Sequence, residues 1–211
     1  MKNLCMFVSV CAFAFAVTAA RAGDAKTFKP DDEGFIRNWL VLEAIQLDDK
    51  AANHDEDNQK DFFNKEFFKD LKKCAPKDGD KVKVDTKDLA WKATQFDDAV
   101  CAFAEQDNTM NIAVTYVTCE ADIPDVKLKI GSDDSSIWLL NGKEIIRVFA
   151  GRGVEKDQDT SGAVKLNKGV NVLMGQVING GGPTGMCARF VDKDDKPVKN
   201  ITIGLTPPAA P

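Results

Sequence analysis

Short hydrophobic runs separated by turn residues dominate the chain from position 81 onward. Within them Ile112, Val114 and Tyr116 alternate with smaller residues, and Leu128 and Ile130 alternate with lysines. A period of two is typical of half-buried β-strands, and many short strands in series are typical of a sandwich or barrel. No long helical period interrupts the series, which disfavours a parallel α/β sheet. The pattern therefore predicts an all-β sandwich.

The first part of the chain follows a different pattern. Residues 35–42 (FIRNWLVL) contain strand formers and no breaker, which predicts a strand. Further on, Phe63, Phe67 and Leu71 recur every fourth residue, with charged residues between them. This spacing predicts one short amphipathic helix over residues 60–73.

Turn residues mark where the strands connect. Asn141-Gly142 lies between SSIWLL and KEIIRV, and this dipeptide favours a tight hairpin because both positions need a positive φ. Residues 167–169 (NKG) predict a second turn. The segment 180–185 (GGGPTG) predicts a flexible connection before the last main strand.

The N-terminus has the features of a secretory signal peptide. Lys2 precedes an apolar run over residues 4–17, and residues 20–22 (ARA) supply a small-x-small cleavage pattern. We therefore expect a signal peptide over residues 1–22 and export to the periplasm or the extracellular space. The apolar run is too short to span a bilayer and no other segment is apolar enough, so no membrane insertion is expected after cleavage.

A single domain is expected over residues 23–206, followed by a disordered Pro/Ala tail over residues 207–211. Cleavage of the leader removes Lys2 and Arg21 and no acidic residue. This leaves 26 of the 28 basic residues against 33 acidic ones, a net charge of −7. An acidic surface repels phosphate backbones, so nucleic acid is not the expected partner.

Four cysteines remain after the leader: Cys74, Cys101, Cys119 and Cys187. An even count in an exported chain predicts two disulfides, and three pairings satisfy it. The spacings contain no C-x-x-C, which disfavours zinc. A catalytic thiol needs a basic or histidine-rich neighbourhood, and the chain has one histidine, His54.

Catalytic motifs are missing from the sequence. The chain has no G-x-S-x-G, no H-E-x-x-H and no P-loop. Its histidine lies in the acidic segment 54–57 (HDED), which is more typical of a solvated loop than of a site. Two carboxylates can hydrolyse a glycoside, but a chain with 33 acidic residues always offers such pairs. We therefore expect no enzyme, with a carboxylate-based hydrolase as the minor alternative.

The segment over residues 130–179 carries a specific resemblance to a known family. It reads IGSDDSSIWLLNGKEII, then D-Q-D, then AVKLNKGVNVLMGQVIN, and a Gly-rich turn and MCARFVD follow. This order resembles the galactose-binding-like, or jelly-roll, β-sandwich domains found beside catalytic domains in exported bacterial glycosidases and esterases. The resemblance covers residues 35–205 and implies a jelly-roll fold and carbohydrate recognition.

The resemblance also bears on sugar stacking and on the disulfides. Met186 and Cys187 stand where relatives often open the last strand with an aromatic residue, and stacking aromatics grip sugar rings. The W-x-N-G hairpin also carries an extra leucine. On jelly-roll logic the strand ending at Cys119 lies near the strand bearing Cys187, which favours the pairs Cys119–Cys187 and Cys74–Cys101.

Five residues are candidates for ligand contact: Asp133, Asp134, Asn141, Arg152 and Arg189. Their carboxylate, amide and guanidinium groups suit sugar hydroxyls presented to the loops of such a sandwich. Each class also has a structural interpretation, because turn aspartates accept backbone N–H bonds and arginines pair with aspartates.

The segment 157–162 (DQDTSG) is typical of a calcium loop. Asp157, Asp159 and Ser161 place hard oxygens two residues apart, which suits Ca²⁺. Lys168, however, stands where an EF-hand carries its bidentate glutamate, and the family has D-x-D here as an ordinary loop feature. A calcium ion that rigidifies the loops and a plain loop both remain open.

The leading hypothesis is a non-catalytic, exported carbohydrate-recognition or accessory module, with a glycan as partner and calcium as the cofactor to test. The second hypothesis is a structural or protein-interaction subunit of the cell envelope. In that case the predicted helix docks an envelope protein or caps the end of the sandwich, because four phenylalanines exceed what one narrow stripe can bury. These are Phe62, Phe63, Phe67 and Phe68.

Overall fold

The computed structural model describes residues 26–207. The predicted signal peptide, residues 1–22, lies outside the described residues, as does the predicted tail apart from Pro207. Within the described range no helix is long and apolar enough to cross a bilayer.

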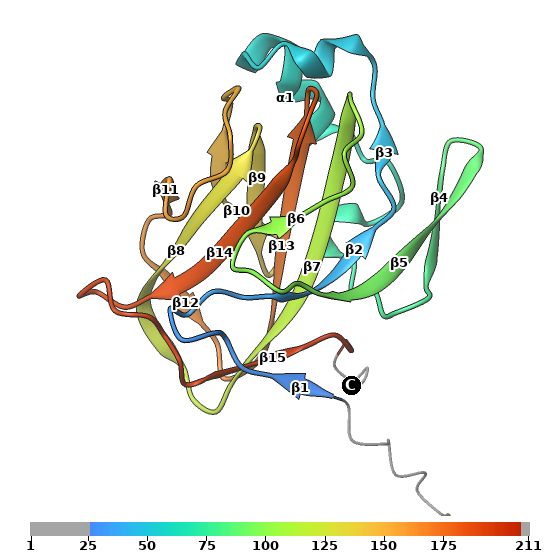
Figure 1. Ribbon diagram of the computed structural model, residues 1–211. Coiled ribbons are helices and arrows are strands. Elements are labelled where there is room, and N and C mark those ends of the chain that lie inside the picture. Colours follow the sequence, from blue (N-terminus) through green and yellow to red (C-terminus); the bar gives the residue numbers. More distant parts are fainter. Residues whose placement is uncertain (1–25, 208–211) are drawn as a thin grey trace, which may run out of the picture.

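Two antiparallel sheets pack face to face, which confirms the predicted all-β sandwich (Figure 1). The larger, ten-stranded sheet has the order β10 (Lys143–Val148), β9 (Ser136–Leu140), β13 (Gly169–Asn179), β7 (Thr109–Cys119), β2 (Asn38–Leu42), β5 (Lys87–Gln95) and β4 (Lys81–Val84), with β1 (Thr27–Phe28), β15 (Ile201–Gly204) and β3 (Ile45–Gln46) attached along it. The smaller, five-stranded sheet has the order β11 (Asp159–Thr160), β8 (Ile123–Asp133), β14 (Gly185–Val191) and β6 (Cys101–Ala102), with β12 (Val164–Leu166) also paired to β8.

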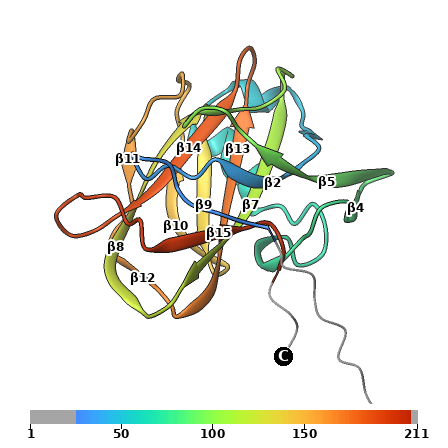
Figure 2. The same ribbon diagram turned by 60° about the horizontal axis from the view of Figure 1, so that its bottom comes forward.

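The ends of the described chain lie side by side at one end of the sandwich. Figure 1 shows β1 next to β15, and their register pairs Thr27 with Gly204. The β4–β5 hairpin stands away from the body in both Figure 1 and Figure 2.

Strand β7 forms the centre of the molecule and is covered on both faces. It pairs with β13 along its whole length, from Thr109 opposite Asn179 to Cys119 opposite Gly169. Ala113 faces the core between the two sheets, whereas Ile112 faces a second core on the outer side of the larger sheet. Burial on both faces explains why this run is nearly continuous in apolar residues.

Tryptophans fill both cores. Trp39 and Trp138 meet between the sheets with their ring centroids 6.2 Å apart in an edge-on arrangement. Trp91 lies in the outer core. Gly175 on β13 makes room for Trp138, because a Cβ there would lie 2.9 Å from the indole ring.

The predicted N-terminal strand begins later than expected. Phe35 and Ile36 first pair with β14 of the smaller sheet, where Phe35 bridges to Arg189 and Ile36 N donates to Ala188 O. The chain then crosses to the larger sheet as β2. The run FIRNWLVL therefore serves both sheets in turn, which a single strand assignment misses.

A helical cap covers the outer core of the larger sheet. It consists of η1 (Asp49–Ala52), α1 (Glu56–Asn64) and η2 (Leu71–Lys73), so the predicted helix over residues 60–73 is wrong in extent. Asp55 starts α1 earlier because its carboxylate accepts a hydrogen bond from Asn58 N at 2.9 Å. Helical geometry is broken before η2 by Asp70, whose φ is +58°.

The four phenylalanines of this region pack inward. Phe63 and Phe68 are buried in the outer core, and Phe62 and Phe67 pack against it while partly exposed. Of the two alternatives for these rings, the structure therefore favours capping of the sandwich over a free docking stripe. Two of the rings project from α1 and two from the segment that follows it. They therefore approach the same face of the larger sheet from different backbone segments, which the residues of one continuous helix cannot do.

Two predicted turns are confirmed, as is the position of the Gly-rich connection. Asn141 and Gly142 join β9 to β10 with φ values of +53° and +77°, the geometry that favours this dipeptide. Gly169 follows the second turn with φ +88°. Residues 180–184 connect β13 to β14.

All four cysteines are thiols, so the predicted disulfides are wrong. Cys119 faces the core between the sheets, whereas Cys187 lies on the outer side of the smaller sheet beside Phe35. Cys101 likewise faces the inter-sheet core, and Cys74 packs against the core beyond the larger sheet. Each predicted pair is thus separated by a sheet. Burial raises the pKa of Cys101 to about 12 and that of Cys187 to about 11, which makes both thiols unreactive.

Candidate functional site

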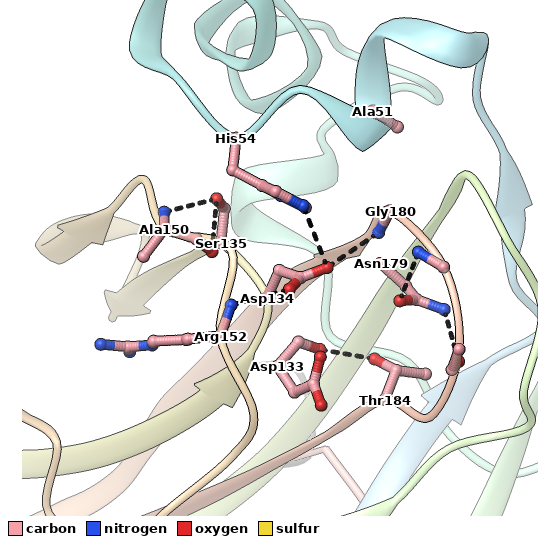
Figure 3. A network of polar contacts seen from close by, with 12 residues as sticks. Ala51, His54, Asp133, Asp134, Ser135, Ala150, Arg152, Asn179, Gly180 and Thr184 are labelled. Atoms are coloured by element: carbon pink, nitrogen blue, oxygen red, sulfur yellow. Dashed lines mark hydrogen bonds and ion pairs between the residues drawn. The ribbon is translucent and has the colours of Figure 1, made fainter.

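Loops from distant parts of the sequence meet at the end of the sandwich next to η1 and α1 (Figure 1). We call this region the loop end. It comprises the turn Asp133–Asp134 between β8 and β9, residues 149–153 after β10, residues 180–184 after β13, and His54 between η1 and α1. Figure 3 shows the polar contacts among them.

Asp134 ties these loops together. One carboxylate oxygen, Oδ1, accepts a hydrogen bond from Arg152 N at 2.9 Å, and Oδ2 accepts one from Gly180 N at 2.9 Å. The residue is only 7% exposed. A buried carboxylate that satisfies two backbone donors is a structural group, so the structural interpretation applies to Asp134.

Asp133 differs from its neighbour in having an unused carboxylate. Its backbone carbonyl accepts a hydrogen bond from Thr184 Oγ1 at 2.6 Å, but its half-buried side chain accepts none from residues 26–207. Burial, and next the charge of Asp134, raise the pKa of this carboxyl to about 6, and His54 opposes the shift. The peptide bond between the two aspartates is cis. Asp133 therefore offers an acceptor that the protein itself leaves open.

The Gly-rich loop of residues 180–184 is held by side chains below it. The buried Asn179 donates from Nδ2 to Gln106 O (2.9 Å) and Gly182 O (3.2 Å), and its Oδ1 accepts from Gly181 N (3.1 Å). Asp107 accepts a further hydrogen bond from Gly182 N at 3.0 Å. These hydrogen bonds hold the segment that the sequence predicts to be flexible, and it forms one side of the loop end.

Of the other candidate residues, only Arg152 lies at the loop end. Asn141 lies at the opposite end of the sandwich, where Oδ1 accepts from Val172 N (2.8 Å) and Nδ2 donates to Asn171 (3.0 Å). Arg189 stacks on Phe35 on the outer side of the smaller sheet. Arg152 contributes its backbone N–H to Asp134, but its guanidinium turns away to Ser132 Oγ at 3.1 Å.

The predicted calcium loop is occupied by protein contacts. Asp157 pairs with both Nε and NH2 of Arg189, and Asp159 pairs with Arg152 at 2.5 Å. Ser161 Oγ accepts from Leu128 N at 2.9 Å. Among residues 26–207 no three histidine, cysteine or acidic side chains converge as metal ligands would. As they stand these side chains do not form a calcium site, and calcium binding there stays a prediction.

Sequence reasoning missed His54, Asn179 and Thr184. His54 was assigned to a solvated acidic loop, yet its imidazole reaches Asp134, as Figure 3 shows. Nothing in the local sequence marks these three residues, because their importance arises from loops that meet only after folding. The single available signal was that His54 is the chain's only histidine and precedes a helix N-cap.

Comparison with known proteins finds no family model and no curated protein that matches the chain. Among solved structures, the PA14 domain of the MpAFP antifreeze protein is similar at 11% identity and a TM-score of 0.43, covering 85% of this chain and 97% of that one. A subtype-switched Epithelial Adhesin 9 to 1 A domain from Candida glabrata, in complex with beta-lactose, is similar at 9% identity and a TM-score of 0.34, covering 86% and 94%.

A third similar structure is the beta-glucosidase from Kluyveromyces marxianus in complex with glucose. The identity is 14%, the TM-score is 0.39, and the match covers 64% of this chain. The matched region spans 19% of that enzyme's length. At these TM-scores the three likenesses do not identify a family.

Proposed function

We propose that this chain is a non-catalytic carbohydrate-recognition module of an exported protein, and that Asp133 at the loop end binds sugar hydroxyls. The observation that carries the proposal is the half-buried Asp133 carboxylate without a partner among the described residues, set in a turn whose neighbours are all hydrogen-bonded. Hydrogen bonds from hydroxyls to an ionised carboxylate are among the stronger neutral-to-charged contacts. A braced turn presents that acceptor with little loss of entropy on binding.

The arrangement does not favour a glycosidase. Hydrolysis by two carboxylates needs both to face the scissile bond, one as acid and the other as base or nucleophile. Asp134, the neighbour of Asp133, is buried, and each of its carboxylate oxygens accepts a hydrogen bond from a backbone N–H group. Asp133 is therefore suited to binding and lacks its catalytic partner in this turn.

The proposed binding rests on hydrogen bonds more than on ring stacking. The last main strand opens with Met186 and Cys187, which are both buried, so this strand supplies no stacking ring. Sites without a stacked aromatic bind sugars weakly, and we expect a dissociation constant of about 1 mM for a single sugar unit.

Thermal unfolding against a panel of polysaccharides tests the proposal. A ligand that binds only the folded state must raise the melting temperature. We expect a shift with at least one glycan, and we expect Asp133→Ala to abolish it. Parallel series with calcium and with a chelator show whether the ion takes part.

The control variant is Asp88→Ala, which removes an exposed carboxylate from β5, a strand separated from β9 by β13, β7 and β2 in the larger sheet. This variant should keep the full shift. If no glycan stabilises the wild-type protein under any condition, or if Asp133→Ala responds as the wild type does, the proposed function is wrong.

A further inference from the structure

The imidazole of His54 sits at the point where the helical cap meets the loop end (Figure 3). Its Nε2 lies 3.7 Å from Asp134 Oδ2, and its Nδ1 lies 3.3 Å from Gln59 Nε2 on α1. The side chain is 26% exposed. One ring therefore contacts both the cap and the carboxylate that ties the loops together.

The contacts of Gln59 determine which ring nitrogen carries the proton. Gln59 is fully buried, and its Nε2 also donates to Ala51 O at 2.6 Å. A flipped amide would place an oxygen against that carbonyl oxygen, so the orientation of Gln59 is fixed. Its second Nε2 hydrogen then points to His54 Nδ1, which must accept. The neutral ring therefore carries its proton on Nε2, facing Asp134.

Two glycines shape a slot for the ring. A Cβ at Gly151 would lie 2.5 Å from the imidazole, and a Cβ at Gly180 would lie 2.7 Å from it. Real Cβ atoms do not approach this closely, so any larger residue at either position would push the ring out. Gly180 also donates its backbone N–H to Asp134. The loop at residues 180–184 thus both borders the imidazole and donates a hydrogen bond to the Asp134 carboxylate.

We infer that His54 is a positioning residue, whose imidazole locks the helical cap onto the loop end and holds Asp134 in register with the loops at residues 149–153 and 180–184. Asp133 precedes Asp134 directly, so its open carboxylate is held through the same lock. The locking role follows from these contacts alone, whereas its effect on sugar binding rests on the proposed function.

The tautomer is tested first, on the unmodified protein. Because the chain has a single histidine, a two-bond ¹H–¹⁵N correlation spectrum contains one imidazole pattern. We expect the neutral form to carry its proton on Nε2, and we expect Gln59→Leu to weaken that preference because the donor to Nδ1 is lost. A neutral ring protonated on Nδ1 would overturn the inference.

Hydrogen exchange then tests the lock. In His54→Ala we expect the amides of Arg152 and Gly180 to exchange about tenfold faster, since both donate to Asp134. His54→Gln should restore part of the protection, because a glutamine amide nitrogen reaches near the Nε2 position. Asn53→Ala, an exposed neighbour, should leave both rates unchanged. Equal exchange in His54→Ala and wild type would contradict the lock.

These measurements need no ligand, so they separate the lock from the proposed function. If a glycan does stabilise the wild type, His54→Ala should weaken its binding and His54→Gln should recover part of it. Faster exchange without any glycan response would support the lock and overturn the sugar-binding role.

Discussion

Two adjacent aspartates serve opposite purposes at the loop end. Asp134 is buried and accepts hydrogen bonds from two loops, whereas the carboxylate of Asp133 has no partner among residues 26–207. The sequence motif D-D does not reveal this difference, because only the backbone N–H groups of Arg152 and Gly180, which are distant in sequence, distinguish Asp134 from Asp133. Substitutions at the two positions should therefore change stability in opposite directions.

Asp134→Ala should destabilise the protein by about 3 kcal/mol, since two backbone N–H groups lose their acceptor in a buried region. Urea unfolding of this variant beside Asp88→Ala measures the difference. A cost no greater than that of the exposed control would show that the network at Asp134 carries little stability.

Asp133→Asn should stabilise the protein at pH 7.5 by about 1 kcal/mol, a figure reduced for solvent screening of a half-buried group. The folded-state pKa of about 6 lies above the ordinary value of 3.8, so the folded state binds this proton more tightly than the unfolded state. Between about pH 4 and pH 6 the contribution of Asp133 to the stability of the wild type therefore falls as pH rises.

The asparagine variant lacks this titration, so its advantage over the wild type should vanish at pH 3.5. Melting temperatures of both proteins at the two pH values measure the effect. An asparagine variant that is less stable than the wild type at pH 7.5 would contradict the assigned burial. A gain in stability with a loss of glycan response is the expected trade-off at a binding residue.

At the scale of elements, strands were predictable and helix ends were not. Residues 112–117 were correctly predicted as a strand, although β7 is buried on both faces and not on one alone. The helix prediction failed after Asn64 because Phe67 and Leu71 keep a helical spacing in sequence while the backbone leaves the helix. The left-handed conformation of Asp70 is a local choice that apolar spacing does not report.

Packing of β13 against β9 gives a test at this scale. Gly175→Ala should destabilise the protein by about 2 kcal/mol, because its methyl group would lie 2.9 Å from the Trp138 ring in a packed core. Gly162→Ala is the matched control, since a Cβ there meets nothing within 4 Å. Equal melting temperatures for the two variants would show that Trp138 yields without cost.

At the scale of the whole molecule, the two sheets and the cap create three layers that no local pattern specifies. The all-β class followed from the strand series, but the meeting of His54, Asp134, Arg152 and Gly180 depends on how distant loops return to one end. The disulfide prediction failed at this scale too, because counting cysteines does not show which side of a sheet each one occupies.

Thiol titration of the whole protein tests that layered arrangement. Unfolded in denaturant without reductant, a chain that begins at residue 23 should release four reactive thiols, because sheets separate both predicted pairs. The folded protein should react slowly, since burial raises the thiol pKa values. Recovery of two or no thiols from protein that was never reduced would show that a disulfide forms.

Because the native sheets separate these cysteines, folding and thiol oxidation compete while the chain is being made. In an oxidising compartment an unfolded chain with four thiols can cross-link at random, and a link between cysteines that the native sheets hold apart would block the sandwich from closing. The native fold hides its sulfurs only once both sheets have formed. The yield of correct protein in such a compartment should therefore depend on how quickly the chain folds compared with how quickly it is oxidised.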